Sequence, residues 1–220
     1  MGRVRFLQVA VALAALVALA GCEQVFTYNV FSEFSRDPAN LSTQQKRTYA
    51  QSALESGDQG AMDEAYKAIR DEALASDDPE LTSLATDLAL GASGINDVAP
   101  DLAEKAISGE LSDSEAIEET VKNSLDKIDT DSLGDVADLI NKTKENGGTV
   151  SEEQYVLAAA GLAAKEAKEA QDAGKDVDNL TADDFEEAQD FVNNAKEDLE
   201  GRGETSETLD LLEDYINGTS

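Results

Sequence analysis

The chain has 220 residues, of which 47 are acidic and 17 basic, so its formal net charge is −30. It contains no histidine and a single cysteine, which excludes a histidine general base, an internal disulfide and a thiolate zinc site. The negative charge would repel a phosphate backbone, and we therefore expect no nucleic acid partner.

Residues 1–21 have the organisation of an export signal. Arg3 and Arg5 form a positive n-region, and the apolar h-region that follows is interrupted only by Gln8. This h-region is short for a membrane-spanning helix, and no stop-transfer pattern follows it. A plain signal peptide or a short anchor helix is one interpretation of the segment.

Four residues at the end of the segment favour another interpretation. Leu19-Ala20-Gly21-Cys22 resembles the lipobox of bacterial lipoproteins. The resemblance implies that the Cys22 thiol is diacylated and that cleavage makes Cys22 the first residue. Acyl chains contribute about 0.8 kcal/mol per buried CH₂, so two or three chains anchor a protein stably. An Asp directly after the lipidated cysteine would resemble an inner-membrane retention signal. The residue at this position is Glu23, so we expect attachment to the outer membrane, facing the periplasm.

Residues 22–40 are expected to form a lipidated tether that is rich in aromatic side chains. Phe26, Tyr28, Phe31 and Phe34 lie close together in it. We predict that these four side chains dock onto the first helices and cover an apolar end of the domain. An aromatic anchor at the membrane interface and a patch that recruits a partner are the alternatives.

The remainder of the chain, residues 41–220, is expected to be an acidic all-α domain. Only 5% of the residues are aromatic, so the core must consist mainly of Ala, Leu, Val and Ile, a composition that favours helices. Helix starts recur 36, 34 and 39 residues apart, and further breaks lie between them, which predicts four helical hairpins and one extra helix over about 206–217. The starts are Ser42-x-x-Gln45, Asp78-Pro79, Ser112-x-x-Glu115 and Ser151-x-x-Gln154.

Apolar residues inside these segments repeat with helical spacing. The stripes are Met62, Ala65, Tyr66, Ile69 and Ala73; Leu81, Leu84, Ala85 and Leu88; Leu133, Val136, Leu139 and Ile140; and Phe185, Ala188, Val192, Ala195 and Leu199.

A helix-turn-helix unit that recurs at about 34 residues resembles the tetratricopeptide repeat. The first unit carries the resemblance, through Tyr49-Ala50, Ala53, Gly57-Asp58, Met62, Tyr66, Ile69 and Pro79. The resemblance implies a right-handed array of about eight to nine antiparallel helices. Later units match only in period and length, and the third has Glu118 and Glu119 where small residues are expected. An irregular helical bundle is therefore the alternative.

The acidic residues suggest no specific chemistry. The segment from Asp129 to Gly134 begins like a calcium-binding EF-hand loop, but Leu133 and Ile140 occupy two ligand positions. Acidic pairs such as Asp77-Asp78 and Glu186-Glu187 lie at expected helix starts, where the helix dipole favours negative charge. We therefore expect no metal, no cofactor and no enzymatic activity.

Cleavage before Cys22 would remove Arg3 and Arg5 and change the formal charge from −30 to −32. The acidic residues are spread over the whole chain, which favours a role in solubility at high salt. Recognition of a basic partner is the alternative interpretation.

The sequence as a whole predicts a lipoprotein that serves as a protein-interaction scaffold or assembly factor in the cell envelope. A ligand-handling accessory of a transport system, resembling the T-component lipoproteins of TRAP transporters, is the second hypothesis. A purely structural envelope protein is the third. The hypotheses differ in what the helices form: an apolar tunnel favours transport, and a filled core with a bare apolar groove favours the scaffold.

Overall fold

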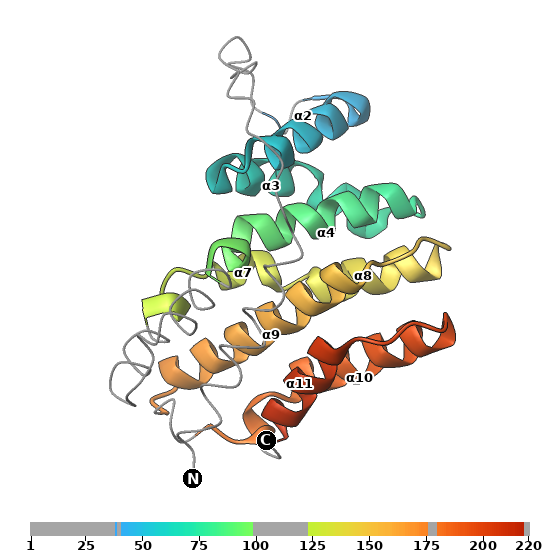
Figure 1. Cartoon of the computed structure of the whole chain (residues 1–220). Coiled ribbons are helices and arrows are strands. Elements are labelled where there is room, and N and C mark those ends of the chain that lie inside the picture. Colours follow the sequence, from blue (N-terminus) through green and yellow to red (C-terminus); the bar gives the residue numbers. More distant parts are fainter. Residues whose placement is uncertain (1–37, 39–40, 99–122, 176–179, 218–220) are drawn as a thin grey trace.

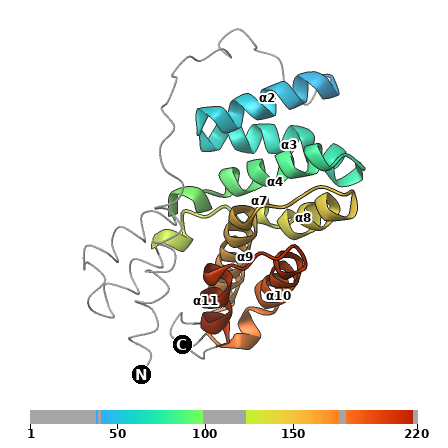
Figure 2. The same ribbon diagram turned by 45° about the vertical axis from the view of Figure 1, so that its right-hand side comes forward.

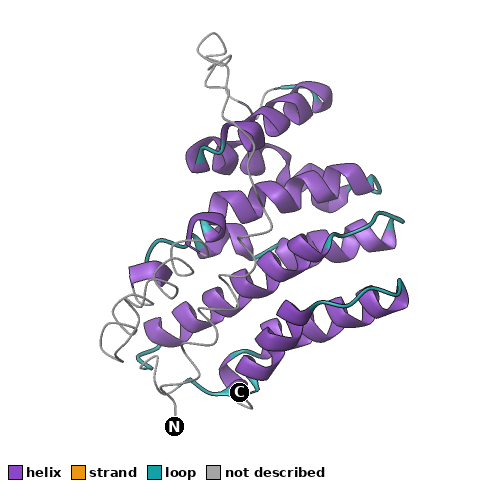
Figure 3. Ribbon diagram, in the orientation of Figure 1, coloured by secondary structure: helices purple, strands orange, loops and turns teal. Residues whose placement is uncertain are grey.

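The computed structural model describes residue 38 and residues 41–98, 123–175 and 180–217 of the chain. Every regular element within these ranges is a helix, and none of the described residues forms a strand (Figure 3). The all-α prediction is therefore confirmed. The elements are α2 (Thr43–Ser56), α3 (Gln59–Ala75), α4 (Pro79–Ser93), α7 (Thr130–Leu133), α8 (Val136–Glu145), α9 (Glu152–Asp172), η4 (Ala182–Asp184), α10 (Glu186–Gly201) and α11 (Glu207–Ile216).

The helices are stacked in layers that follow the order of the chain. Figure 1 shows α2 and α3 at one end, α4 with α8 and α9 in the middle, and α10 and α11 at the other end. The turned view in Figure 2 keeps the same order. Because α4 packs against α3 on one side and against α8 and α9 on the other, it is the central element of the described array.

The helix starts predicted by the capping patterns are confirmed where the structure describes them. Ser42 and Ser151 each form a capping box with the glutamine three residues later, and the Asp78 carboxylate accepts a hydrogen bond from the backbone N–H of Glu80 at 2.9 Å. The expected start at Ser112 lies outside the described residues. The extra helix predicted over 206–217 is α11.

The core has the aliphatic, alanine-rich character expected from the composition. The predicted stripe on α3 is buried throughout, and so is the stripe that ends at Leu199. Two tyrosines are also buried, with exposed fractions of 2% for Tyr66 and 1% for Tyr155, and their hydroxyl groups donate to the carboxylates of Asp135 and Asp198. Polar partners from neighbouring helices therefore hold the largest core side chains.

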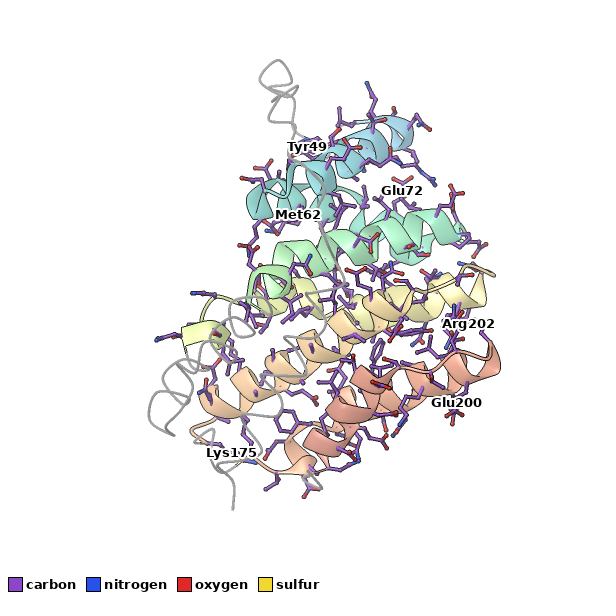
Figure 4. The ribbon with its side chains drawn as sticks, viewed as in Figure 1. Tyr49, Met62, Glu72, Lys175, Glu200 and Arg202 are labelled. Carbon is purple, nitrogen blue, oxygen red and sulfur yellow. The ribbon has the colours of Figure 1, made fainter. Side chains whose placement is uncertain are left out.

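Met62 of α3 (labelled in Figure 4) packs against Gly91 of α4. A Cβ atom added at Gly91 would lie only 2.3 Å from the Met62 sulfur. Glycine therefore leaves room for the Met62 thioether, and a larger residue would require this flexible side chain to move.

The structure differs from the expected order of contacts at α8. This helix packs directly on α4, and the buried hydroxyl group of Thr143 donates to that of Thr82 at 2.7 Å. The helix expected to pair with α4, before the predicted start at Ser112, lies mostly outside the described residues. The predicted stripe from Leu133 to Ile140 is buried, but it is divided between α7 and α8 because the chain turns at Gly134 and places Asp135 against α3.

Candidate functional site

The site residues predicted from the sequence lie outside the described part of the chain. They are Cys22, the predicted lipid attachment site, and the four tether aromatics Phe26, Tyr28, Phe31 and Phe34. Acylation of Cys22 and docking of the tether therefore stay predictions.

A groove crosses the surface of α4. Two adjoining hollows, of about 450 and 510 Å³, share Ser83 and Asp87 in their linings. Glu80, Ser83, Asp87 and Leu90 follow one another by three or four residues, so they form one face of α4. This face is the floor of what we call the α4 groove.

The two walls of the α4 groove come from different parts of the chain. One wall is the face of α2 that carries Arg47, Gln51 and Leu54. The other wall is the loop at Gly148 and Thr149 together with the first turns of α9. Figures 1 and 2 show α2 and α9 on opposite sides of α4. The groove thus depends on the stacking of three helices from separate predicted hairpins.

Close packing fixes the wall at Gly148. A Cβ atom added there would lie 2.6 Å from Cβ of Pro79 and 2.9 Å from the backbone oxygen of Thr143. Because one of these neighbours is backbone, the loop could not hold a larger residue at this position without moving. Glycine therefore lets the loop between α8 and α9 lie against the start of α4.

Asp87 is the ionisable group at the centre of the groove. Its carboxylate is partly buried and accepts a hydrogen bond from the side-chain amide of Gln154 at 2.7 Å. The same amide donates to the Ser83 hydroxyl at 3.1 Å. Burial raises the pKa of Asp87 above its ordinary value, the bond from Gln154 opposes this, and the charge of Glu153 adds to it.

No lysine or arginine of the described residues forms an ion pair with Asp87. The groove does contain a cation, Arg47, but its guanidinium pairs with Asp78 at the start of α4. The remaining charged groups of the lining are the exposed carboxylates of Glu80 and Glu153. The groove therefore has an excess of negative charge.

One end of the groove is apolar. Leu54 of α2, Leu90 of α4 and Leu157 of α9 line the same hollow as Asp87. Leu84, which the sequence placed in the core stripe of α4, is only partly buried and lines the adjoining hollow. The groove thus combines a central carboxylate with aliphatic surface.

A smaller hollow, of about 180 Å³, lies between α8, α9 and α10. Tyr155 at its base donates to Asp198 at 2.9 Å, and the ammonium group of Lys144 lies 3.3 Å from the same carboxylate. Arg202 also pairs with Asp198, at 3.4 Å. Each polar group in this cluster has a partner within the protein, so we interpret the cluster as a structural link between the helices.

The described residues form neither a cluster of metal ligands nor a membrane-spanning helix. They contain no group of three or more residues that could hold a metal ion. In the segment that begins like an EF-hand, Asp129 caps α7 through the backbone N–H of Asp131, while Leu133 and Ile140 are buried in the core. No helix in the described ranges has both the length and the apolar character required to cross a membrane.

No family model, curated protein or solved structure matches the chain. The function must therefore be inferred from the sequence motifs and from the α4 groove.

Asp87 and the second role of Gln154 were not predicted from the sequence. Gln154 completes the capping box of α9, as predicted, through its side-chain oxygen. Its nitrogen is left to bridge to α4, a contact over 67 positions of sequence. The available signal was the polar series Glu80, Ser83 and Asp87 on a helix whose other faces are apolar.

Proposed function

We propose that this chain is a membrane-anchored lipoprotein of the cell envelope whose helical array binds a protein partner, as a scaffold or assembly factor. The α4 groove carries the proposal. It is open at the surface and crosses three helices, and surfaces of stacked helices suit extended peptides and partner helices.

A binding role accounts for the groove better than catalysis does. The Ser83 hydroxyl accepts a hydrogen bond from an amide, which cannot remove its proton. The chain has no histidine to serve as a base. The Asp87 carboxylate lies on the same face of α4, but the hydrogen bonds of the groove join both it and the Ser83 hydroxyl to Gln154 and not to each other, whereas activation of a serine nucleophile requires a base in contact with it. We therefore propose no enzymatic activity.

The transport hypothesis receives less support from the same groove. An apolar ligand is best held in a pocket with a predominantly apolar lining. The α4 groove instead contains Arg47, Glu80, Asp87 and Glu153 together with its leucines. This mixed lining favours a polar chain that carries some apolar side chains, which is the character of a peptide.

Photo-crosslinking tests the scaffold proposal. We would introduce p-benzoylphenylalanine in the full chain at Glu153, on the rim of the groove, and in a matched control at Glu145, which is also an exposed glutamate but lies outside the groove lining. In cells that make the protein natively, we expect a protein adduct at position 153 and none at position 145. Equal labelling at both positions, or no protein adduct at position 153, would contradict the proposal.

The anchoring part of the proposal depends on Cys22. In a Cys22→Ser variant the thiol that the lipobox resemblance assigns to acylation is absent, so we expect an uncleaved or soluble precursor that no longer partitions into the detergent phase. A variant that is cleaved and still partitions like wild type would show that the chain is not a lipoprotein.

A further inference from the structure

The centre of the α4 groove presents a carboxylate, that of Asp87, to which none of the described residues supplies a counter-charge. Of the ion pairs between described residues, several join neighbouring helices, such as Arg70 with Asp135 and Lys196 with Asp210. The Asp87 carboxylate instead accepts a hydrogen bond from the neutral amide of Gln154. A partly buried carboxylate without a counter-charge is stabilised when a bound ligand brings a cation next to it.

The surroundings of Asp87 restrict the kind of cation that would fit. A divalent metal requires several oxygen ligands, and no cluster of potential metal ligands occurs in the described part of the chain. Aliphatic side chains, by contrast, line both hollows that Asp87 borders: the partly buried Leu84 lines one, and the partly buried Leu54 and Leu157 line the other. An aliphatic stem with a charged end matches this combination, and lysine and arginine side chains have that form.

We propose that the α4 groove recognises an extended segment of its protein partner through a lysine or arginine side chain, whose charged group pairs with Asp87 and whose methylene groups pack on Leu84 or on Leu54 and Leu157. The inference rests on the proposed scaffold function and specifies the chemistry of the partner. It also gives the acidity of this protein a local role, in addition to any effect on solubility.

The other charged groups of the groove are consistent with this assignment. Glu80 and Glu153 stand on the rim and add to the negative potential around Asp87, which attracts a basic segment during encounter. Arg47 would compete for Asp87, but Asp78 holds it at the other end of the lining. Burial and Glu153 raise the pKa of Asp87, and a bound cation would lower that pKa again.

The test uses the full chain in detergent micelles and three fluorescent peptides with the sequence Ser-Ala-Leu-Ala-Xaa-Ala-Leu-Ala-Ser, acetylated and amidated at their ends. The central residue is Lys, Gln or Glu. In an extended peptide alternate side chains share a face, so the two leucines and the central residue can enter the groove together. Fluorescence anisotropy would measure the affinity of each peptide for wild type, for Asp87→Asn and for the matched control Asp138→Asn, an exposed position of α8 outside the groove lining.

We expect wild type to bind the Lys peptide about tenfold more tightly than the Gln peptide, and the Glu peptide most weakly. Asp87→Asn should remove the preference for Lys, whereas Asp138→Asn should keep it. Circular dichroism of both variants would establish that they are folded. Equal affinity of wild type for the Lys and Gln peptides, failure of the Lys peptide to bind, or an unchanged preference in Asp87→Asn would overturn the inference.

Failure of this inference differs from failure of the scaffold proposal. If the Gln peptide binds wild type as tightly as the Lys peptide while the crosslink at position 153 forms, the groove binds protein but selects no cation. If the crosslink does not form, the groove is not where the partner binds, and both proposals fail.

Discussion

Asp135 and Asp87 are both partly buried, but their hydrogen-bond partners differ. Asp135 accepts hydrogen bonds from the Tyr66 hydroxyl at 2.8 Å and from the Arg70 guanidinium at 2.9 Å. These bonds, that of Arg70 above all, hold the pKa of Asp135 below its ordinary value against the opposing effect of burial. Burial instead raises the pKa of Asp87.

The two carboxylates differ in whether a cation accompanies them. At Asp135 the guanidinium of Arg70 supplies the counter-charge, and the result is a link between α3 and α8. At Asp87 the described residues supply an amide and no cation, so the carboxylate costs stability unless a ligand completes its surroundings. The first arrangement stabilises the fold, and our binding proposal rests on the second.

The largest effect is expected when the Asp135 cluster is broken. Asp135→Ala removes the carboxylate that binds both Arg70 and Tyr66, and the buried Tyr66 hydroxyl is left without its acceptor. We expect a loss of roughly 2 kcal/mol in the free energy of unfolding, measured by urea denaturation. A loss below about 0.5 kcal/mol would mean that the two aspartates do not differ as described.

Salt should stabilise the fold as a whole and weaken peptide binding at the α4 groove. The melting temperature should rise by several degrees between about 0.01 M and 1 M NaCl, because screening relieves the repulsion that a net charge of −30 creates. Over the upper part of this range, binding of the Lys peptide to the α4 groove should weaken. A melting temperature that does not change with salt would show that the carboxylates are already compensated by the ion pairs.

The carboxylate of Glu166 is intermediate between those of Asp135 and Asp87, because its partners are backbone N–H groups and not a cation. Glu166 of α9 accepts hydrogen bonds at 2.9 Å from the backbone N–H groups of Glu187 and Ala188, and so caps the start of α10 from a neighbouring helix. Burial raises its pKa, and the two backbone bonds oppose that shift. Glu166→Ala should cost about 1 kcal/mol, as the loss of a helix cap does, and thermal denaturation would measure it. An unchanged melting temperature would show that water replaces this cap.

The smallest effect on stability is expected at Asp87 itself, and its sign is informative. The folded pKa of Asp87 lies above the ordinary value, so its contribution to stability is full at low pH and is lost as the pH rises through the folded pKa. Asp87→Asn should therefore match or exceed wild type near pH 7, by at most about 0.5 kcal/mol, and its advantage should shrink as the pH falls towards about 3. Clear destabilisation near pH 7 would contradict this role of Asp87.

Local signals were sufficient to predict most of the described fold. Capping residues such as Ser42 and Ser151 satisfy the free N–H groups of the turn that follows them, so their effect can be read within a few residues. Helical periodicity likewise identified the buried stripe on α3. The packing of α8 on α4 could not be predicted, because the contact between Thr82 and Thr143 joins residues 61 positions apart.

The candidate site was less predictable than the fold for the same reason. A polar residue such as Asp87 on a helix reads as solvent-exposed unless its neighbours in space are known. Leu84 fits the apolar stripe of α4 by spacing alone, and only the position of α2 and the loop at Gly148 shows that it borders a groove. The lipid attachment predicted at Cys22 and the docking predicted for the tether aromatics stay predictions.

The pKa of Asp87, measured with and without a basic peptide, tests most directly whether the groove holds an anion that awaits a cation. Carbon NMR of the full chain labelled at the aspartate carboxyl carbons would follow the titration, with Asp87→Asn to assign the signal. We expect a pKa above the ordinary value of about 3.9 in the free protein, and a fall when the Lys peptide binds but not when the Gln peptide is added. A pKa at or below the ordinary value in the free protein, or one that the Lys peptide leaves unchanged, would contradict the role that we assign to the α4 groove.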